Sequence, residues 1–131
     1  MVIDTSAIIA ILFAEAEATA MVQAIEDDPM RVVGGPTMVE AAAVMLGKTG
    51  PGGLIALDAL FHRLHISVEP FPASAADYSR SAYTKFGKGV GSPAVLNYGD
   101  CLSYGMAKAL GEPLLFTGEG FHRTDVDAVA Y

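Results

Sequence analysis

The first eight residues constrain the fold of this chain more than any other stretch. The segment Met1–Ile3 is apolar and two of its three residues are β-branched, which predicts a short buried strand. Asp4 follows at the carboxyl end of that strand, and Thr5 and Ser6 can cap a helix over residues 7–14. Because open α/β sheets bind ligands outside the carboxyl ends of their strands, Asp4 is either a functional carboxylate or only a capping one.

Strands and helices alternate along the rest of the chain. Short apolar runs predict strands at 1–3, 30–33, 66–68 and 114–116, with a fifth short element near 126–129. Helical spacing predicts further helices at 14–28, 38–46, 54–64, 73–86 and 100–110. Gly/Pro-rich breaks are expected at 47–53 and 87–93. This alternation predicts a three-layer α/β/α fold with a central parallel sheet of four to five strands, in a single domain over residues 1–131.

Composition narrows the class of protein. No apolar run approaches the ~20 residues of a membrane span. We expect no signal peptide, because the first residues lack a basic region and Asp4 interrupts their apolar stretch. Hydrophobic residues nevertheless make up 52% of the chain, so we expect a homodimer or a tightly bound partner to cover apolar surface. The single cysteine, Cys101, suits a reducing cytoplasm and is expected in the core. A net charge of −7 argues against a protein that coats nucleic acid generally.

Four carboxylates stand apart from the others by their context. Asp4 and Glu119 each follow a predicted strand, whereas Glu40 and Asp100 lie in helices that otherwise look buried. Each has a simpler interpretation. Glu40 lies three residues after Thr37 and could complete a capping box, Asp100 could favour the positive end of its helix, and Glu119 could be solvated.

If these carboxylates converge, a cation must lie among them. Two unit charges ~4 Å apart repel by about 4 kcal/mol at an effective dielectric constant of 20. Oxygen ligands without histidine or cysteine suit Mg²⁺ or Mn²⁺ rather than zinc. Such an ion can activate water and stabilise charge on a phosphodiester, so the pattern predicts metal-assisted phosphodiester hydrolysis.

A locally basic segment precedes the Asp100 helix. Arg80, Lys85 and Lys88 fall within nine positions, and no acidic residue lies between Asp77 and Asp100. Aromatic residues are interleaved with these cations, a pattern that occurs where proteins stack bases and hold phosphates. The segment could bind RNA, or it could be a solvated helix face followed by a loose loop.

Four segments of the chain together resemble the PIN-domain family, and more narrowly its VapC-type ribonuclease toxins of bacterial type II toxin–antitoxin systems. They are Met1-Val2-Ile3-Asp4-Thr5-Ser6-Ala7, Thr37-Met38-Val39-Glu40, Leu96-Asn97-Tyr98-Gly99-Asp100-Cys101-Leu102-Ser103-Tyr104, and Leu114-Leu115-Phe116-Thr117-Gly118-Glu119-Gly120-Phe121 with the following Thr124-Asp125-Val126. The resemblance covers essentially the whole chain.

The resemblance implies Mg²⁺- or Mn²⁺-dependent cleavage of RNA in the bacterial cytoplasm. It also implies dimerisation and inhibition by a cognate VapB-like antitoxin. Asp4, Glu40 and Asp100 match the acidic core of the family. Thr5, Ser6 and Thr117 match polar positions that support it.

The fourth segment departs from the family pattern. It often carries two acids before its phenylalanine, where this chain has Glu119 and Gly120. Glu119 is therefore the candidate for the fourth catalytic acid, and we expect one strong metal site. Two rival hypotheses are a catalytically degenerate PIN domain that acts as a binding scaffold, and a phosphate-accepting receiver module. The receiver fold needs two adjacent acids after its first strand, whereas here Asp4 is followed by Thr5 and Ser6.

Overall fold

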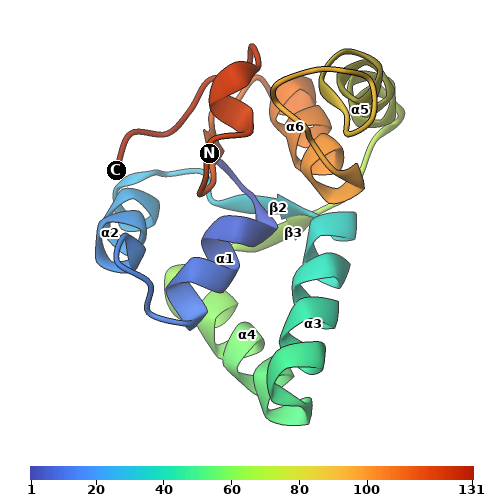
Figure 1. Ribbon diagram of the computed structural model, residues 1–131. Helices are drawn as coiled ribbons and strands as arrows, with labels where there is room; N and C mark the ends of the chain where they lie inside the picture. The colour runs from blue at the N-terminus through green and yellow to red at the C-terminus, as the bar shows by residue number, and fades with distance from the viewer.

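A small parallel sheet lies between two layers of helices (Figure 1). The structure, a computed structural model, describes residues 1–131. The strands are paired in the order β3-β2-β1-β4, with bounds β1 (Val2–Ile3), β2 (Val32–Gly34), β3 (Ser67–Glu69) and β4 (Leu114–Leu115). The helices are α1 (Thr5–Leu12), α2 (Ala18–Asp27), α3 (Gly35–Thr49), α4 (Pro51–Leu64), α5 (Ala73–Phe86), α6 (Tyr98–Leu110) and the 3₁₀ turn η1 (Phe121–Arg123). The predicted three-layer α/β fold is confirmed.

Successive residues of β1 and of β4 enter different cores, because side chains alternate across a strand. Val2 and Leu114 pack with α5 and α6, whereas Ile3 and Leu115 pack with helices α1 to α4. All four side chains are fully buried. Two apolar clusters therefore hold the sheet from both faces, as expected for a parallel sheet in an α/β protein.

The order in which strands are added to the sheet changes side at β1, although all strands run parallel. β2 and β3 extend the sheet on one side of β1, whereas β4 pairs with its other edge through the registers Val2–Leu114 and Ile3–Leu115. A crevice opens outside the carboxyl ends of the strands at such a reversal. The residues that follow β1 and β4, Asp4 and Thr117 among them, lie at this crevice.

Three details of the predicted helices were wrong. α1 begins at Thr5 and is capped by Asp4, whose carboxylate accepts a hydrogen bond from the Ser6 backbone N–H, so Thr5 and Ser6 are not its caps. α2 begins at Ala18, not residue 14, because Ala14 has a left-handed backbone conformation that interrupts the helix. The break expected at 47–53 shrinks to Gly50, whose φ of 71° joins α3 directly to α4.

The expected fifth strand is only a single bridge. Leu114 pairs with Ala128, and the Val129 N–H donates to the Leu114 carbonyl, but the pairing does not continue. Side chains fasten this tail instead, since the Tyr104 hydroxyl donates to the Asp125 carboxylate over 2.6 Å. The sheet accordingly has four strands.

No helix is both long enough and apolar enough to pass through a membrane.

Cys101 is buried, as predicted, and burial raises the pKa of its thiol to about 11. The thiol is therefore protonated at neutral pH and is not a nucleophile.

α5 and α6 approach closely at Gly105. A side chain there would overlap the Ser79 hydroxyl and the Ala75 carbonyl oxygen on α5. Because backbone on α5 cannot yield cheaply, we expect Gly105→Ala to lower the free energy of unfolding by about 1–3 kcal/mol, measured by urea denaturation. Gly47→Ala is the matched control, since it adds the same methyl group to α3 with no atom within 4 Å. Equal stability of the two variants would contradict the close approach.

Candidate active site

A polar cavity of about 290 Å³ lies at the carboxyl edge of the sheet. Asp4, Glu40 and Asp100 all line it, and they come from three separated parts of the chain. The remaining lining residues are Thr5, Ser6, Ile9, Glu15, Asn97 and Thr117. The structure thus brings together three of the four carboxylates that the sequence singled out.

Asp4 is the most deeply buried of the three, with 2% of its surface exposed. Its Oδ2 atom accepts hydrogen bonds from the Ser6 N–H at 2.9 Å and the Ser6 hydroxyl at 2.6 Å. The Ser6 Oγ in turn accepts from the Thr117 N–H at 3.1 Å, which ties the start of α1 to the end of β4. The capping interpretation of Asp4 is confirmed, and the same side chain also lines the cavity.

Glu40 is held by a partner from another element. The Thr5 hydroxyl donates to Glu40 Oε2 over 2.6 Å, joining α1 to α3. The alternative that Glu40 completes a capping box with Thr37 was wrong. α3 begins at Gly35, so Thr37 lies inside the helix, and its hydroxyl is 3.3 Å from the Ser103 hydroxyl.

Asp100 belongs to the capping box that the structure does contain. The Asn97 side chain accepts from the Asp100 N–H, and Asp100 Oδ2 accepts from the Asn97 N–H, both over 2.8 Å. Burial raises the pKa of Asp100 to about 6, the Asn97 hydrogen bond opposes that rise, and the nearby charges of Asp4 and Glu40 add to it. The charges of Asp4 and Glu40 are therefore close enough to change the pKa of Asp100.

Each of the three carboxylates leaves one oxygen without a hydrogen bond from the protein. Asp4, Glu40 and Asp100 use a single oxygen each in the bonds described above. The other oxygen of Asp4, Oδ1, is fully buried and has no partner at all. Burying a carboxylate oxygen without a hydrogen-bond donor costs free energy. The three free carboxylate oxygens therefore fit as ligands of a hard divalent cation. No group of three acidic, histidine or cysteine side chains is drawn together tightly enough to enclose such an ion.

The fourth predicted acid lies elsewhere. Glu119 is exposed in the turn after β4 and does not line the cavity. Glu15, in the turn after α1, lines the cavity instead. Asn97 is the other residue that the sequence reasoning gave no role, although the Asn-x-x-Asp spacing before an apolar helix was a readable capping signal.

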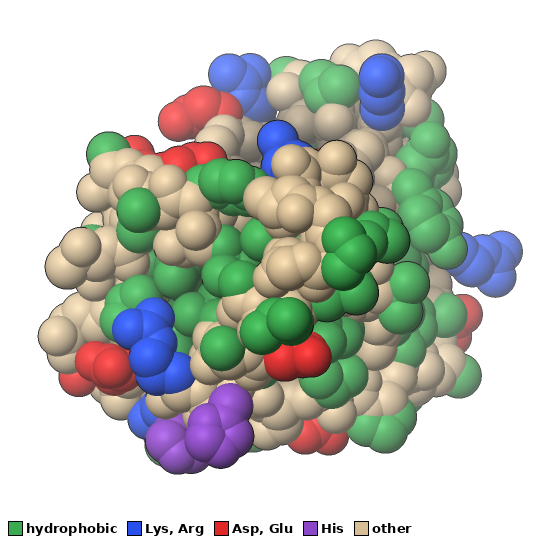
Figure 2. Space-filling model, turned by 90° about the horizontal axis from the view of Figure 1, so that it is seen from below, with side chains coloured by type: hydrophobic (Ala, Val, Ile, Leu, Met, Phe, Trp, Pro, Cys, Tyr) green, Lys and Arg blue, Asp and Glu red, His purple; other side chains and the backbone are tan.

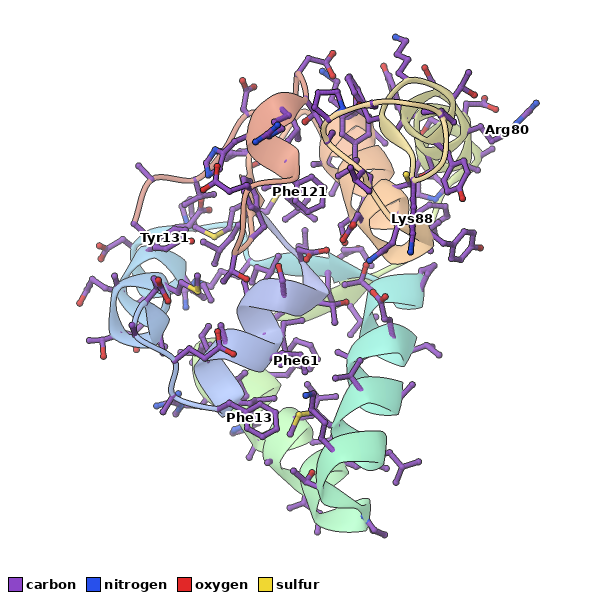
Figure 3. All side chains as sticks on the ribbon, in the orientation of Figure 1. Phe13, Phe61, Arg80, Lys88, Phe121 and Tyr131 are labelled. Carbon is purple, nitrogen blue, oxygen red and sulfur yellow. The ribbon has the colours of Figure 1, made fainter.

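None of the predicted RNA-binding cations lines the carboxylate cavity. Arg80 and Lys85 are on α5, and Lys88 is in the loop that leads to α6. Figure 3 shows Arg80 directed outward from α5 and Lys88 beside α6. Arg80 and Lys88 are exposed, and no salt bridge engages any of the three. They remain free to bind an anion.

Comparison with known proteins places the chain in a family. A family model of the PIN domain matches residues 1–127. The chain is also 46% identical to a ribonuclease VapC of Mycolicibacterium smegmatis, over 98% of this chain and 99% of that protein. The chain belongs to the VapC family of PIN-domain ribonucleases. The resemblance carried by the four sequence segments is confirmed.

Other VapC proteins match over similar lengths. Ribonuclease VapC30 of Mycobacterium tuberculosis is 44% identical over 99% of this chain and 98% of that protein, and VapC42 of the same organism is 40% identical over 96% of each. The crystal structure of M. tuberculosis VapC20, described as a sarcin-ricin loop cleaving toxin, superposes with a TM-score of 0.74 over 98% of this chain and 97% of that one. At 14% identity, this last likeness shows the shared fold.

Gly99 fixes how close α6 can lie to Glu40. A side chain at position 99 would overlap the Glu40 carboxylate, which is the movable end of a flexible side chain. We expect Gly99→Ala to displace that carboxylate, break its bond to Thr5 and slow RNA cleavage about 10-fold, with little change in the unfolding temperature. Gly47→Ala on the same helix as Glu40 is the matched control. Full activity of Gly99→Ala, measured as the rate of RNA cleavage, would show that the observed position of Glu40 is not required.

Proposed function

We propose that the cavity lined by Asp4, Glu40 and Asp100 is the active site of a divalent-metal-dependent endoribonuclease. The observation that carries this proposal is the buried, unpartnered Oδ1 of Asp4 beside two further carboxylates with free oxygens. Asp4, Asp100 and Glu40 would hold Mg²⁺ or Mn²⁺. When bound, such an ion supplies positive charge that polarises a phosphodiester and acidifies a water molecule.

The side chains around the cavity prepare it for hydrolysis. Ser6 fixes the orientation of Asp4, Asn97 fixes that of Asp100, and Thr5 fixes that of Glu40. With its position set by Thr5, Glu40 is suited to accept a hydrogen bond from the attacking water. In the reaction, water oxygen bonds to phosphorus, the P–O bond to the leaving ribose oxygen breaks, and that oxygen gains a proton. Thr117 supports the arrangement through its N–H bond to Ser6.

Arg80, Lys85 and Lys88 would guide RNA toward this cavity. The whole chain carries a net charge of −7, so its few free cations are the places where a phosphate backbone is attracted rather than repelled. Their spread along α5 and its following loop suits an extended strand. Reversing their charge would weaken binding and flatten its dependence on salt.

Apolar surface supports the remaining partners, a second copy of the chain and a VapB-like antitoxin. Large hydrophobic side chains are exposed just after α1 and on α3 and α4, namely Phe13, Val39, Leu46 and Ile55. Figure 2 shows hydrophobic side chains gathered across the face that is lowest in Figure 1. Basic residues of an antitoxin segment could enter the acidic cavity. We place the protein in the bacterial cytoplasm, in keeping with these partners and with its lone reduced cysteine.

Metal dependence provides the test. A labelled mixture of structured RNAs should be cut in Mg²⁺ or Mn²⁺, and excess EDTA should reduce cutting to the background of a buffer control. Adding back the metal should restore it. A folded protein that cuts no RNA in any metal would instead favour the second candidate, a scaffold that binds without cleaving, for which the exposed position of Glu119 is the supporting observation.

A further inference from the structure

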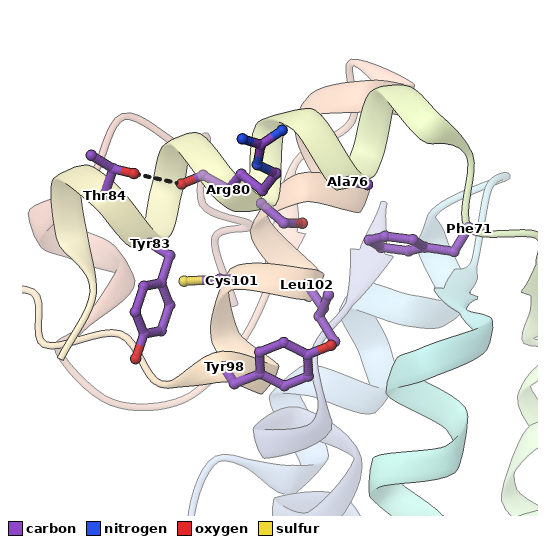
Figure 4. A pocket seen from close by; sticks show the side chains of 9 residues that line it. Phe71, Ala76, Arg80, Tyr83, Thr84, Tyr98, Cys101 and Leu102 are labelled. Carbon is purple, nitrogen blue, oxygen red and sulfur yellow. Dashed lines mark hydrogen bonds between the residues drawn. The ribbon is translucent and has the colours of Figure 1, made fainter.

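A second cavity lies between α5 and α6, on the other side of the first turn of α6 from the carboxylates. Its volume is about 520 Å³, within the range of sites for small ligands. Figure 4 shows the Tyr83 ring and the Cys101 sulfur at one end, the Phe71 ring at the other, and the Tyr98 ring beside Leu102 between them. Neither the cleavage chemistry nor the metal ligands account for it.

The cavity adjoins the candidate active site through one helical turn. Asn97 and Asp100 line the acidic cavity, whereas Tyr98 and Cys101, which alternate with them in sequence, line the aromatic one. Neighbouring positions on a helix point to different sides, so the first turn of α6 forms the wall between the two. A strand whose phosphate lies at the carboxylates can therefore place an adjoining base in the aromatic cavity.

The two cavities differ in the charge of the residues that line them. The acidic cavity has four carboxylates in its lining, whereas the aromatic cavity has none and includes Arg80 at its edge. The Arg80 guanidinium lies on the outer side of α5, away from the rings (Figure 4). Aromatic faces with a cation at the rim are the usual elements of single-stranded RNA binding, in which bases stack and phosphates are held outside.

The tyrosine rings are available for stacking. Tyr98 is 73% exposed and Tyr83 is 42% exposed, and no hydrogen bond engages the hydroxyl of either. An exposed tyrosine ring whose hydroxyl makes no hydrogen bond loses little on binding and gains stacking on any base.

We propose that this aromatic cavity binds one unpaired nucleobase of the RNA substrate, next to the phosphate that is cut. The proposal rests on the proposed nuclease function and adds a base-binding subsite to it. Stacking alone accepts every base, so the subsite selects unpaired over paired nucleotides. It directs cleavage to loops and single strands.

The test measures binding separately from cleavage. In an Asp100→Asn background, which we expect to be folded and inactive, the affinity for fluorescently labelled hexa-adenylate and hexa-uridylate is measured by anisotropy. Tyr83→Ala and Tyr98→Ala should each weaken binding about 10-fold, and Tyr83→Phe and Tyr98→Phe should keep it. Tyr78→Ala is the matched control, since Tyr78 is also on α5 and 43% exposed but does not line the cavity.

A base analogue locates the effect. Hexamers with 2-aminopurine at one position should show quenching at a single site, and the quenching should disappear in Tyr98→Ala. Affinities of both alanine variants equal to that of the Tyr78→Ala control would overturn the subsite. So would alanine variants that change the monomer–dimer equilibrium in sedimentation but leave RNA affinity intact, because a second copy of the chain would then be the occupant.

The two proposals fail in distinguishable ways. If Tyr83→Ala and Tyr98→Ala bind and cleave RNA like the parent while Asp100→Asn abolishes cleavage, the nuclease stands and the subsite is overturned. If the parent protein neither binds the hexamers nor cuts structured RNA, the nuclease function falls and the subsite falls with it.

Discussion

Replacing Asp100 by asparagine should reduce RNA cleavage by about 100-fold or more while leaving the protein folded. The asparagine side chain keeps an oxygen where Asp100 Oδ2 accepts the Asn97 N–H, so the cap of α6 is retained. It removes the negative charge that a divalent ion requires. The measurement is the initial rate of cleavage at saturating metal, with circular dichroism and thermal unfolding as checks on folding.

Two other acids make this experiment specific. Asp77→Asn on α5 removes one carboxylate from an exposed position outside the cavity and should leave the rate unchanged. Glu119→Gln decides whether that exposed acid takes part, and because Glu119 does not line the cavity we expect a change of less than about threefold. If Asp100→Asn still cleaves RNA at the parent rate, the cavity is not the active site.

Divalent metal should stabilise the protein strongly at pH 7.5 and much less at pH 5. The pKa of Asp100 in the metal-free protein is about 6, above its ordinary value of 3.8, so the folded state favours the protonated form. Its contribution to stability is therefore present at low pH and is lost as pH rises through about 6. A bound cation needs the ionised form, so proton and metal compete for this side chain.

The readout is the rise in unfolding temperature on adding Mn²⁺, measured across this pH range. In Asp100→Asn the step near pH 6 should disappear, because the group that titrates has been removed. A rise in unfolding temperature of equal size at pH 5 and pH 7.5 in the parent protein would show that Asp100 does not bind the ion.

Positions that depend on local sequence could be predicted well. Asp4 follows a strand, and strand ends of a parallel sheet share one edge, so its place in the site followed from the order of elements. The helix that carries Asp100 and the burial of Cys101 followed from periodicity in the same way.

Contacts between distant segments could not be predicted. The hydrogen bond between Thr5 and Glu40 joins residues 35 positions apart, and the local capping-box spacing of Thr37 and Glu40 suggested a different partner. Glu15 reaches the cavity only because the chain turns sharply at Ala14, whose positive φ is unusual for alanine. The separation of Glu119 from the other acids likewise depends on the path of the turn after β4.

The close approach of Gly99 to Glu40 makes two distant positions depend on each other. Because Gly99 has no side chain, the Glu40 carboxylate can occupy the space that a Cβ atom at position 99 would fill. Within the family, a chain with alanine or serine at the first position would need an acid one methylene shorter at the second, with its carboxylate drawn back toward α3. The side chains at positions 99 and 40 share one limited space. The two positions should therefore change together during evolution, even though 58 residues separate them along the chain.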